Sequence, residues 1–175
     1  MVLGLKLNEI ELVPHDPEWE KAFLEEKERI AKIISNKIIG IEHVGSTAIK
    51  TIKAKPIIDI AISLKKYDDG SDCIDPIVSI GYEYKGEFGV PGRHFFRTND
   101  EFVKFHLHMF EISSKSWNDL IFFRDYMNRN PEKAKEYEDL KFRLRQECQG
   151  NRDLYTQHKE TFVKEILEKA SKEKK

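Results

Sequence analysis

The sequence predicts an α+β domain in which helices flank a mixed β-sheet and further helices follow at the C-terminal end. Its 175 residues, 39% of them hydrophobic, suffice for one core, and no repeat or linker divides them, so we expect a single domain over 1–175. Two isoleucine-rich runs, 38–41 and 57–64, have the length and β-branched content of buried strands. Helical periodicity precedes and follows these runs.

The N-terminal part predicts a short strand over 10–13 and then a helix. Asp16 is a good N-cap residue, Pro17 suits the first helical position and Glu18 places an acid in the first turn. Apolar residues then recur at helical spacing, and charged residues occupy the other faces, which we expect in solvent. The predicted buried stripe consists of Trp19, Phe23, Ile30, Ile33 and Ile34.

The segment between the two isoleucine-rich runs predicts a polar turn with ligand-binding capacity. Gly45 can adopt positive φ, while the hydroxyls of Ser46 and Thr47 can cap a short helix over 47–52. A helix start behind a glycine turn can bind phosphate, although a turn that simply requires glycine is nearly as well supported. Asp59 lies among isoleucines, where a carboxylate is costly without a partner, so we expect a metal ion or a buried hydrogen bond to compensate.

The middle of the chain predicts one helix and three strands. A helix over 73–80 should end at Gly81. Aromatic and β-branched residues then concentrate in 82–87, 93–98 and 103–111, which turn-like segments separate. We therefore expect an antiparallel meander.

The C-terminal part returns to helical periodicity. A helix from Trp117 should stop at Asn130, and Pro131 should begin the next one. Gly150 is expected to end that helix, and Asn151 to cap a last helix with a lysine-rich end.

Composition limits the classes of function. Thirty basic and 31 acidic residues give a net charge of −1, which excludes a global basic field for nucleic acid but leaves room for a local basic groove. Cys73 and Cys148 form no metal-ligand spacing, and we expect reduced thiols. With no signal-like or membrane-spanning run, we expect a cytoplasmic protein without a membrane partner. The sequence predicts no particular oligomeric state.

Two histidines are expected to act from one face of a strand. His106 and His108 are two residues apart, so their imidazoles should point to the same side of the sheet. Such a pair can ligate a transition metal, donate to phosphate or act as acid and base; alternatively, one is a hydrogen-bonded core histidine. A zinc site needs a third ligand, for which His43 is a candidate, although a capping role at its strand is better supported.

Several cations are candidate contacts for an anionic ligand: Lys55, Arg93, Arg97, Arg124 and Lys141. Lys55 precedes Pro56 in an extended segment, and Arg93 opens the strand before the histidine pair, so either can neutralise a phosphate. For Arg124 a structural ion pair with Asp125 is an equally good interpretation.

Two segments carry a family resemblance: His43-Val44-Gly45-Ser46-Thr47 and Lys55-Pro56-Ile57-Ile58-Asp59. They resemble the signature of the GrpB family (UPF0157), which is placed in the nucleotidyltransferase superfamily. Later segments agree and extend it over nearly the whole chain: Phe105-His106-Leu107-His108, Phe123-Arg124-Asp125-Tyr126, the helix 131–141, and Tyr155-Thr156 with Lys159.

This resemblance implies a nucleotidyltransferase-like fold and a site. In nucleotidyltransferases a Gly-Ser turn holds the triphosphate, and a downstream strand supplies two carboxylates at alternate positions to a Mg²⁺ pair. Asp59 fits as a metal ligand, but the alternate position is Ala61. Candidate replacement acids are Glu83, Glu87, Glu101 and Glu111. The implied catalytic residues are Asp59, His106 and His108, and the implied ligand contacts are Gly45, Ser46, Thr47, Lys55, Arg93 and Arg124.

The function that follows is binding of a nucleotide or other phosphorylated small molecule, with metal-assisted nucleotidyl transfer as the implied reaction. Because Ala61 replaces a carboxylate, a non-catalytic nucleotide- or RNA-binding module that has lost the metal pair is an alternative. The histidine pair supports a further alternative, a His-ligated metal hydrolase.

Overall fold

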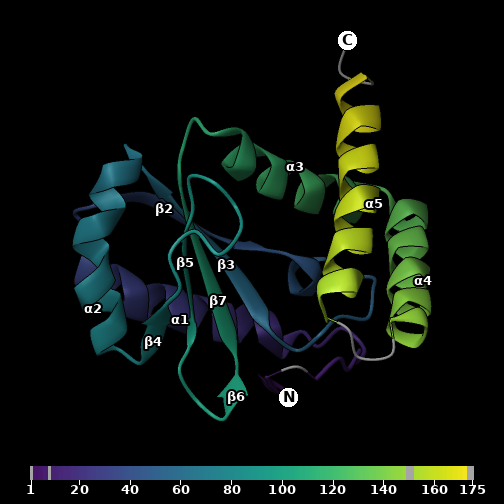
Figure 1. Cartoon of the computed structure of the whole chain (residues 1–175), viewed down its shortest axis with the longest axis horizontal. Coiled ribbons are helices and arrows are strands. Elements are labelled where there is room, and N and C mark those ends of the chain that lie inside the picture. Colours follow the sequence, from purple (N-terminus) through teal and green to yellow (C-terminus); the bar gives the residue numbers. More distant parts are fainter. Residues whose placement is uncertain (1, 8, 149–151, 173–175) are drawn as a thin grey trace.

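The structure is a computed structural model that describes residues 2–7, 9–148 and 152–172. A central sheet separates two groups of helices: α1 and α2 on one side, and α3, α4 and α5 on the other (Figure 1). The expected helix end at Gly150 and cap at Asn151 lie outside the described residues.

The central sheet is mixed, as predicted. Its strand order is β2-β3-β7-β5-β4, and β3 pairs parallel with β7 while every other pairing is antiparallel. The strands are β2 (Ile38–Val44), β3 (Ile58–Leu64), β4 (Tyr82–Tyr84), β5 (His94–Thr98) and β7 (Phe105–Glu111). The antiparallel meander of β4, β5 and β7 is therefore confirmed, and β7 brings its histidines beside β3.

A second, two-stranded sheet joins β1 (Leu5–Lys6) to β6 (Phe102–Val103). The strand expected over 10–13 is wrong: this segment contributes one isolated bridge, between Val13 and Ala54.

One face of the central sheet packs against α1 (Glu18–Ile34) and α2 (Ile74–Ser79). Helix α1 begins at Glu18 with Pro17 as its N-cap, one residue later than predicted, and Asp16 Oδ1 accepts a hydrogen bond from the Glu18 amide at 3.0 Å just before it. Alternate residues of β3 and β7 point into this core: Ile58, Ile60, Ile62, Leu64, Phe105, Leu107 and Met109. Period-two alternation therefore turns the residues between them to the opposite face.

The opposite side carries α3 (Lys115–Arg129), α4 (Pro131–Glu147) and α5 (Arg152–Lys172), and α3 packs on β2, β3 and β7. Ile49 and Ile52 are buried in the core of these helices, 0% and 1% exposed. Their burial pulls the chain into an extended path at Ile49, so the helix expected over 47–52 is reduced to the 3₁₀ turn Ser46–Ala48. A second 3₁₀ helix, Tyr67–Cys73, precedes α2.

Cys73 and Cys148, both expected to be reduced thiols, are free and buried. Across the described helices, none has both the length and the apolar character needed to cross a bilayer.

Candidate functional site

Asp59 and the two histidines meet on the sheet face that points away from α1 and α2. In the parallel pairing of β3 with β7, Asp59 lies opposite His106, and Ala61 lies opposite His108. The flanking isoleucines Ile58 and Ile60 point into the core. The prediction that both imidazoles share one face of the sheet is therefore confirmed, and Asp59 lies on the same face.

The three side chains form one polar cluster. His106 Nδ1 and His108 Nε2 each lie 3.2 Å from Asp59 Oδ1. The carboxylate is 29% exposed, and the imidazoles of His106 and His108 are 16% and 14% exposed. One ligand atom from each residue falls within 4.8 Å of the other two. The partner that a carboxylate on this strand requires is thus the histidine pair.

Charge in this cluster follows from its hydrogen bonds. Burial alone would raise the pKa of Asp59, but hydrogen bonds from His106 and His108 outweigh it and hold that pKa well below its ordinary value. Burial lowers the pKa of His108 despite the adjacent carboxylate. At neutral pH the cluster therefore contains a charged Asp59 and a neutral His108.

Arg93 indicates which nitrogen of His108 carries the proton. Its Nη1 lies 3.3 Å from His108 Nδ1, and a guanidinium can only donate, so Nδ1 accepts and Nε2–H donates to Asp59. Arg93 is itself held by the carbonyls of Glu87 and Phe88, at 3.1 and 2.7 Å, and lies over the ring of Phe95.

The glycine turn packs directly against the carboxylate. Gly45 has φ +70°, as expected, and a Cβ at this position would collide with Asp59 Oδ2. Only glycine meets both demands, conformation and space. The Gly45-Ser46 turn and Asp59 are therefore neighbouring parts of one site.

Thr47 and His43 turn away from this site. The hydroxyl of Thr47, 1% exposed, bonds His43 Nε2 at 3.0 Å, and His43 Nδ1 lies 3.2 Å from Glu20. The ring of His43 also stacks on Phe23. These contacts favour a structural role for both residues, and His43 supplies no third ligand to the cluster.

The other end of the turn is cationic. Lys141 is 2% exposed, and its Nζ donates to the Lys53 carbonyl at 2.5 Å and lies 4.8 Å from the ring centre of Tyr137. Burial lowers the pKa of Lys141 to about 7; the nearby charges of Lys159 and Lys55 lower it further, and that of Glu138 opposes them. Tyr137 also accepts a hydrogen bond from Ser46 Oγ at 3.5 Å, which connects these lysines to the turn.

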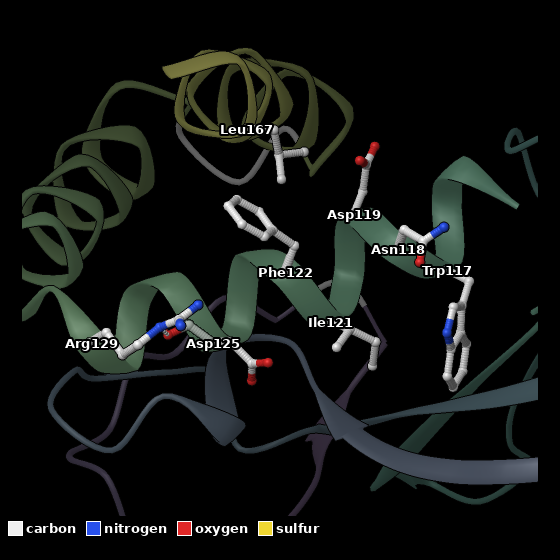
Figure 2. Close-up of a pocket in the computed structure, with 8 residues that line it drawn as sticks. All are labelled: Trp117, Asn118, Asp119, Ile121, Phe122, Asp125, Arg129 and Leu167. Atoms are coloured by element: carbon white, nitrogen blue, oxygen red, sulfur yellow. Dashed lines mark hydrogen bonds between the residues drawn. The ribbon is translucent and has the colours of Figure 1, made fainter. Parts of the chain in front are cut away.

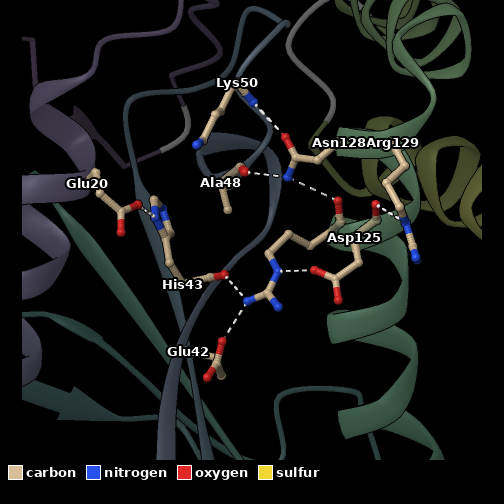
Figure 3. A network of polar contacts seen from close by, with 9 residues as sticks. Glu20, Glu42, His43, Ala48, Lys50, Asp125, Asn128 and Arg129 are labelled. Atoms are coloured by element: carbon tan, nitrogen blue, oxygen red, sulfur yellow. Dashed lines mark hydrogen bonds and ion pairs between the residues drawn. The ribbon is translucent and has the colours of Figure 1, made fainter.

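Arg124 lies in a network of its own. It donates to Glu42 at 2.7 Å, to the His43 carbonyl at 2.9 Å and to Asp125 at 2.8 Å (Figure 3). These acceptors favour the structural alternative for Arg124. Arg97 likewise pairs with Glu83, at 2.7 Å.

The four candidate replacement acids bond elsewhere. Glu83 contacts Lys85 and Arg97, and Glu87 accepts from the Gly92 amide. Glu101 contacts Lys6, and Glu111 accepts from Ser113 and the Tyr67 amide. Among the described residues, none of these four acids joins Asp59, His106 and His108 in the group that could hold a metal ion, so none of them replaces the carboxylate missing at Ala61.

A hollow between α3 and α5 is separate from this site. It is lined by Trp117, Asn118, Asp119, Ile121, Phe122, Asp125, Arg129 and Leu167 (Figure 2). None of the residues of the Asp59 cluster lines it, and we assign it no role in binding.

Two aromatic residues at the site were not predicted from the sequence. Phe95 lies against both imidazoles, with ring centres 5.3 Å from His106 and 5.2 Å from His108. Tyr137 contacts Ser46 and Lys141. Both fit the apolar pattern of their strand or helix, so no local signal distinguishes them from core residues.

Comparison with known proteins identifies the relatives of this chain. A sequence model of the GrpB family, described as GrpB protein, matches residues 9–169. Glutamate-rich protein GrpB of Alkalihalophilus pseudofirmus is 36% identical over 171 residues, covering 95% of this chain and 98% of that protein. UPF0157 protein YqkA of Bacillus subtilis is 34% identical over 166 residues, covering 95% of this chain and 48% of YqkA, so the chain spans about half the length of that relative.

Solved structures agree with the predicted fold. The crystal structure of conserved protein GrpB from Enterococcus faecalis matches with a TM-score of 0.81 and 29% identity, covering 91% of this chain and 99% of that one. Cid1 in complex with the UTP analog UMPNPP matches with a TM-score of 0.52 and 11% identity, covering 77% of this chain and 43% of that one. The latter likeness is one of fold alone, and it confirms the nucleotidyltransferase-like fold.

Proposed function

This chain belongs to the GrpB family, and from that premise we propose that it binds a nucleotide or another phosphorylated small molecule beside Asp59. The observation that carries the proposal is the contact between Gly45 and Asp59. In nucleotidyltransferases the turn that holds the triphosphate and the strand that carries the carboxylate are the two halves of one ligand site. Here the same two features are in direct contact.

The lysines beyond the turn support a phosphorylated ligand. A buried ammonium is costly, and the charges of Lys55 and Lys159 make the protonated form of Lys141 less favourable still, which the charge of Glu138 offsets only in part. An anion placed beside Ser46 relieves that repulsion and gains charge-assisted hydrogen bonds. Arg93, whose guanidinium faces the histidine pair, offers a second positive charge at the other end of the site.

The structural neighbours are consistent with this ligand class. Cid1 is described in complex with a UTP analog, and this chain shares its fold. Nucleotidyl transfer, RNA as a partner and a cytoplasmic location stay predictions from the sequence.

A Mg²⁺ pair, which the fold implies, fits the donor set poorly. Mg²⁺ prefers oxygen ligands in octahedral geometry, and a two-metal site needs shared anionic oxygens. The cluster offers one carboxylate, from Asp59, and two imidazole nitrogens, while Ala61 stands at the second carboxylate position. The binding proposal therefore includes no step through magnesium.

Ligand-dependent thermal unfolding tests the proposal. ATP, GTP, CTP, UTP and inorganic pyrophosphate are compared with the corresponding nucleosides and with a short RNA oligonucleotide. A ligand that binds the folded state at 100 times its Kd adds about 2.7 kcal/mol to the free energy of unfolding. We expect a phosphorylated ligand to shift the transition while nucleosides do not.

The variants Lys141→Met and Lys32→Met form a matched pair. Lys32 is exposed on α1, on the far side of the sheet. Lys141→Met should weaken the ligand shift by about tenfold or more in Kd, since a charge-assisted contact is worth about 1.5–3 kcal/mol. Absence of a shift with every phosphorylated ligand would contradict the proposal, and a shift with the oligonucleotide alone would favour the RNA-binding alternative.

A further inference from the structure

The Asp59 cluster has the composition of a transition-metal site. It combines one carboxylate oxygen with two imidazole nitrogens, a donor set that suits zinc, cobalt, nickel or iron better than magnesium. We propose that Asp59, His106 and His108 bind one divalent transition-metal ion, in place of the magnesium pair that the fold implies. This inference does not depend on the phosphorylated ligand.

The geometry supports a single ion. Zinc lies about 2.0–2.2 Å from oxygen and nitrogen ligands, so tetrahedral ligand atoms are about 3.3 Å apart. Asp59 Oδ1 lies 3.2 Å from both His106 Nδ1 and His108 Nε2, and one ligand atom from each of the three residues lies within 4.8 Å of the other two. The carboxylate oxygen thus stands at the spacing of a metal ligand from each nitrogen.

The surroundings hold the ligands in place. His106 and His108 project from consecutive outward positions of β7, and Phe95 of the neighbouring strand packs against both rings. Gly45 closes the space on the Oδ2 side of Asp59. Three protein ligands leave at least one coordination position open, which is typical of catalytic rather than structural zinc sites.

The contact between Arg93 and His108 is incompatible with a metal ion on His108. While Arg93 donates to His108 Nδ1, the ring proton is on Nε2, the atom that faces Asp59. A metal ion on Nε2 moves this proton to Nδ1, where it meets the guanidinium, another donor. Metal binding must therefore displace Arg93, and replacing this arginine by a residue with an acceptor should strengthen binding.

The experiment is a metal titration of the full chain after treatment with a chelator. Isothermal titration compares Zn²⁺ with Mg²⁺, and the visible absorption of bound Co²⁺ reports the ligand type. We expect one equivalent of Zn²⁺, at least 100-fold tighter than Mg²⁺. The Co²⁺ spectrum should lack a sulfur charge-transfer band, which separates this site from adventitious binding at Cys73 or Cys148.

Variants locate the ion. Asp59→Asn, His106→Gln and His108→Gln should each weaken Zn²⁺ binding by about 100-fold or more, since loss of mere supporting contacts already costs 10–100-fold. His158→Gln is the matched control, because His158 is exposed on α5 and outside the cluster. Circular dichroism establishes that each variant is folded.

Arg93→Gln keeps the test informative if a ligand variant fails to fold. The amide carbonyl of glutamine can accept from His108 Nδ1–H, so we expect Zn²⁺ to bind severalfold tighter than in the unmodified chain. The proposal is overturned if one equivalent of Zn²⁺ does not bind, if the ligand variants bind it as well as the control, or if Mg²⁺ binds equally. Nucleotide-induced stabilisation of the metal-free protein is measured separately, so either proposal can fail alone.

Discussion

The Asp59 site and the Arg124 network both lie beside the Gly45 turn, but their hydrogen-bonding capacity is used differently. Arg124 donates to two carboxylates and a backbone carbonyl. Lys141, the buried cation at the site, donates to one backbone carbonyl, and the charges that act on it are those of two lysines, Lys159 and Lys55, and one carboxylate, Glu138. A cation supplied with acceptors by its own fold is structural, whereas one placed beside further cations is suited to an anion from outside.

The two regions are also physically connected. Arg124, on α3, bonds Glu42 and the carbonyl of His43 on β2, two residues before Gly45. This contact ties the helical side to the strand that leads into the turn (Figure 3). The Arg124 network therefore supports the site without touching its ligand atoms, and the two regions should respond differently to substitution.

The largest expected effect is that of Gly45→Ala. The alanine Cβ would collide with the Asp59 carboxylate, and the backbone conformation, φ +70° with ψ −168°, is nearly restricted to glycine. We expect a loss of about 2–5 kcal/mol in the free energy of unfolding. Gly89→Ala is the matched control, because Gly89 has φ +80° with open space around it and should lose about 1–2 kcal/mol. Equal losses in urea denaturation would mean that the contact with Asp59 is unimportant.

The next effect is that of Arg124→Met, which should lower the free energy of unfolding by about 1–3 kcal/mol. The cost is moderate because Glu42 and Asp125 are 44% and 45% exposed and can turn to water. Arg129→Met, on the exposed side of α3, should change it by less than about 0.5 kcal/mol. Zn²⁺ affinity of the folded Arg124→Met variant should not change. A parallel loss of Zn²⁺ binding would join the two regions into one functional unit.

Lys141 predicts a pH dependence that the Arg124 network lacks. Its folded pKa, about 7, is lower than the ordinary value of 10.5, so between these values the unfolded chain binds more protons than the folded one. Stability should therefore rise with pH through this window, by at most about 1.4 kcal/mol per pH unit. Lys141→Met should remove this rise and Lys32→Met should keep it, as measured by denaturation at pH 7, 8 and 9. An unchanged slope in Lys141→Met would show that Lys141 is not the titrating group.

The smallest effect is that of Glu42→Gln. The amide still accepts a hydrogen bond from Arg124, and the partly exposed ion pair it replaces is worth about 0–1 kcal/mol. The free energy of unfolding should therefore fall by less than about 1 kcal/mol. A loss above 2 kcal/mol would mean that the network is energetically closer to a buried ion pair than its exposure indicates.

Local chemistry made several features of this site predictable from the sequence. Two-residue periodicity placed His106 and His108 on one face of their strand, the cost of a carboxylate among isoleucines showed that Asp59 needs a partner, and the demand for positive φ identified the Gly45 turn. Asp16 and Pro17 located the start of α1 to within one residue. These properties depend on residues only a few positions apart, so they can be predicted from the sequence without knowledge of the fold.

Tertiary structure decided how each polar group is satisfied. Three hydrogen bonds of the site region join residues far apart in the sequence: Arg124 to Glu42, 82 residues apart, Ser46 to Tyr137, 91 apart, and Lys141 to the Lys53 carbonyl, 88 apart. The burial of Ile49 and Ile52 in the helical core overrode the helix expected after the turn. The sequence by itself determined which groups face the sheet surface, because local periodicity sets orientation. Only the fold decided which of them are already paired, because burial and hydrogen-bond saturation come from segments far apart in the chain.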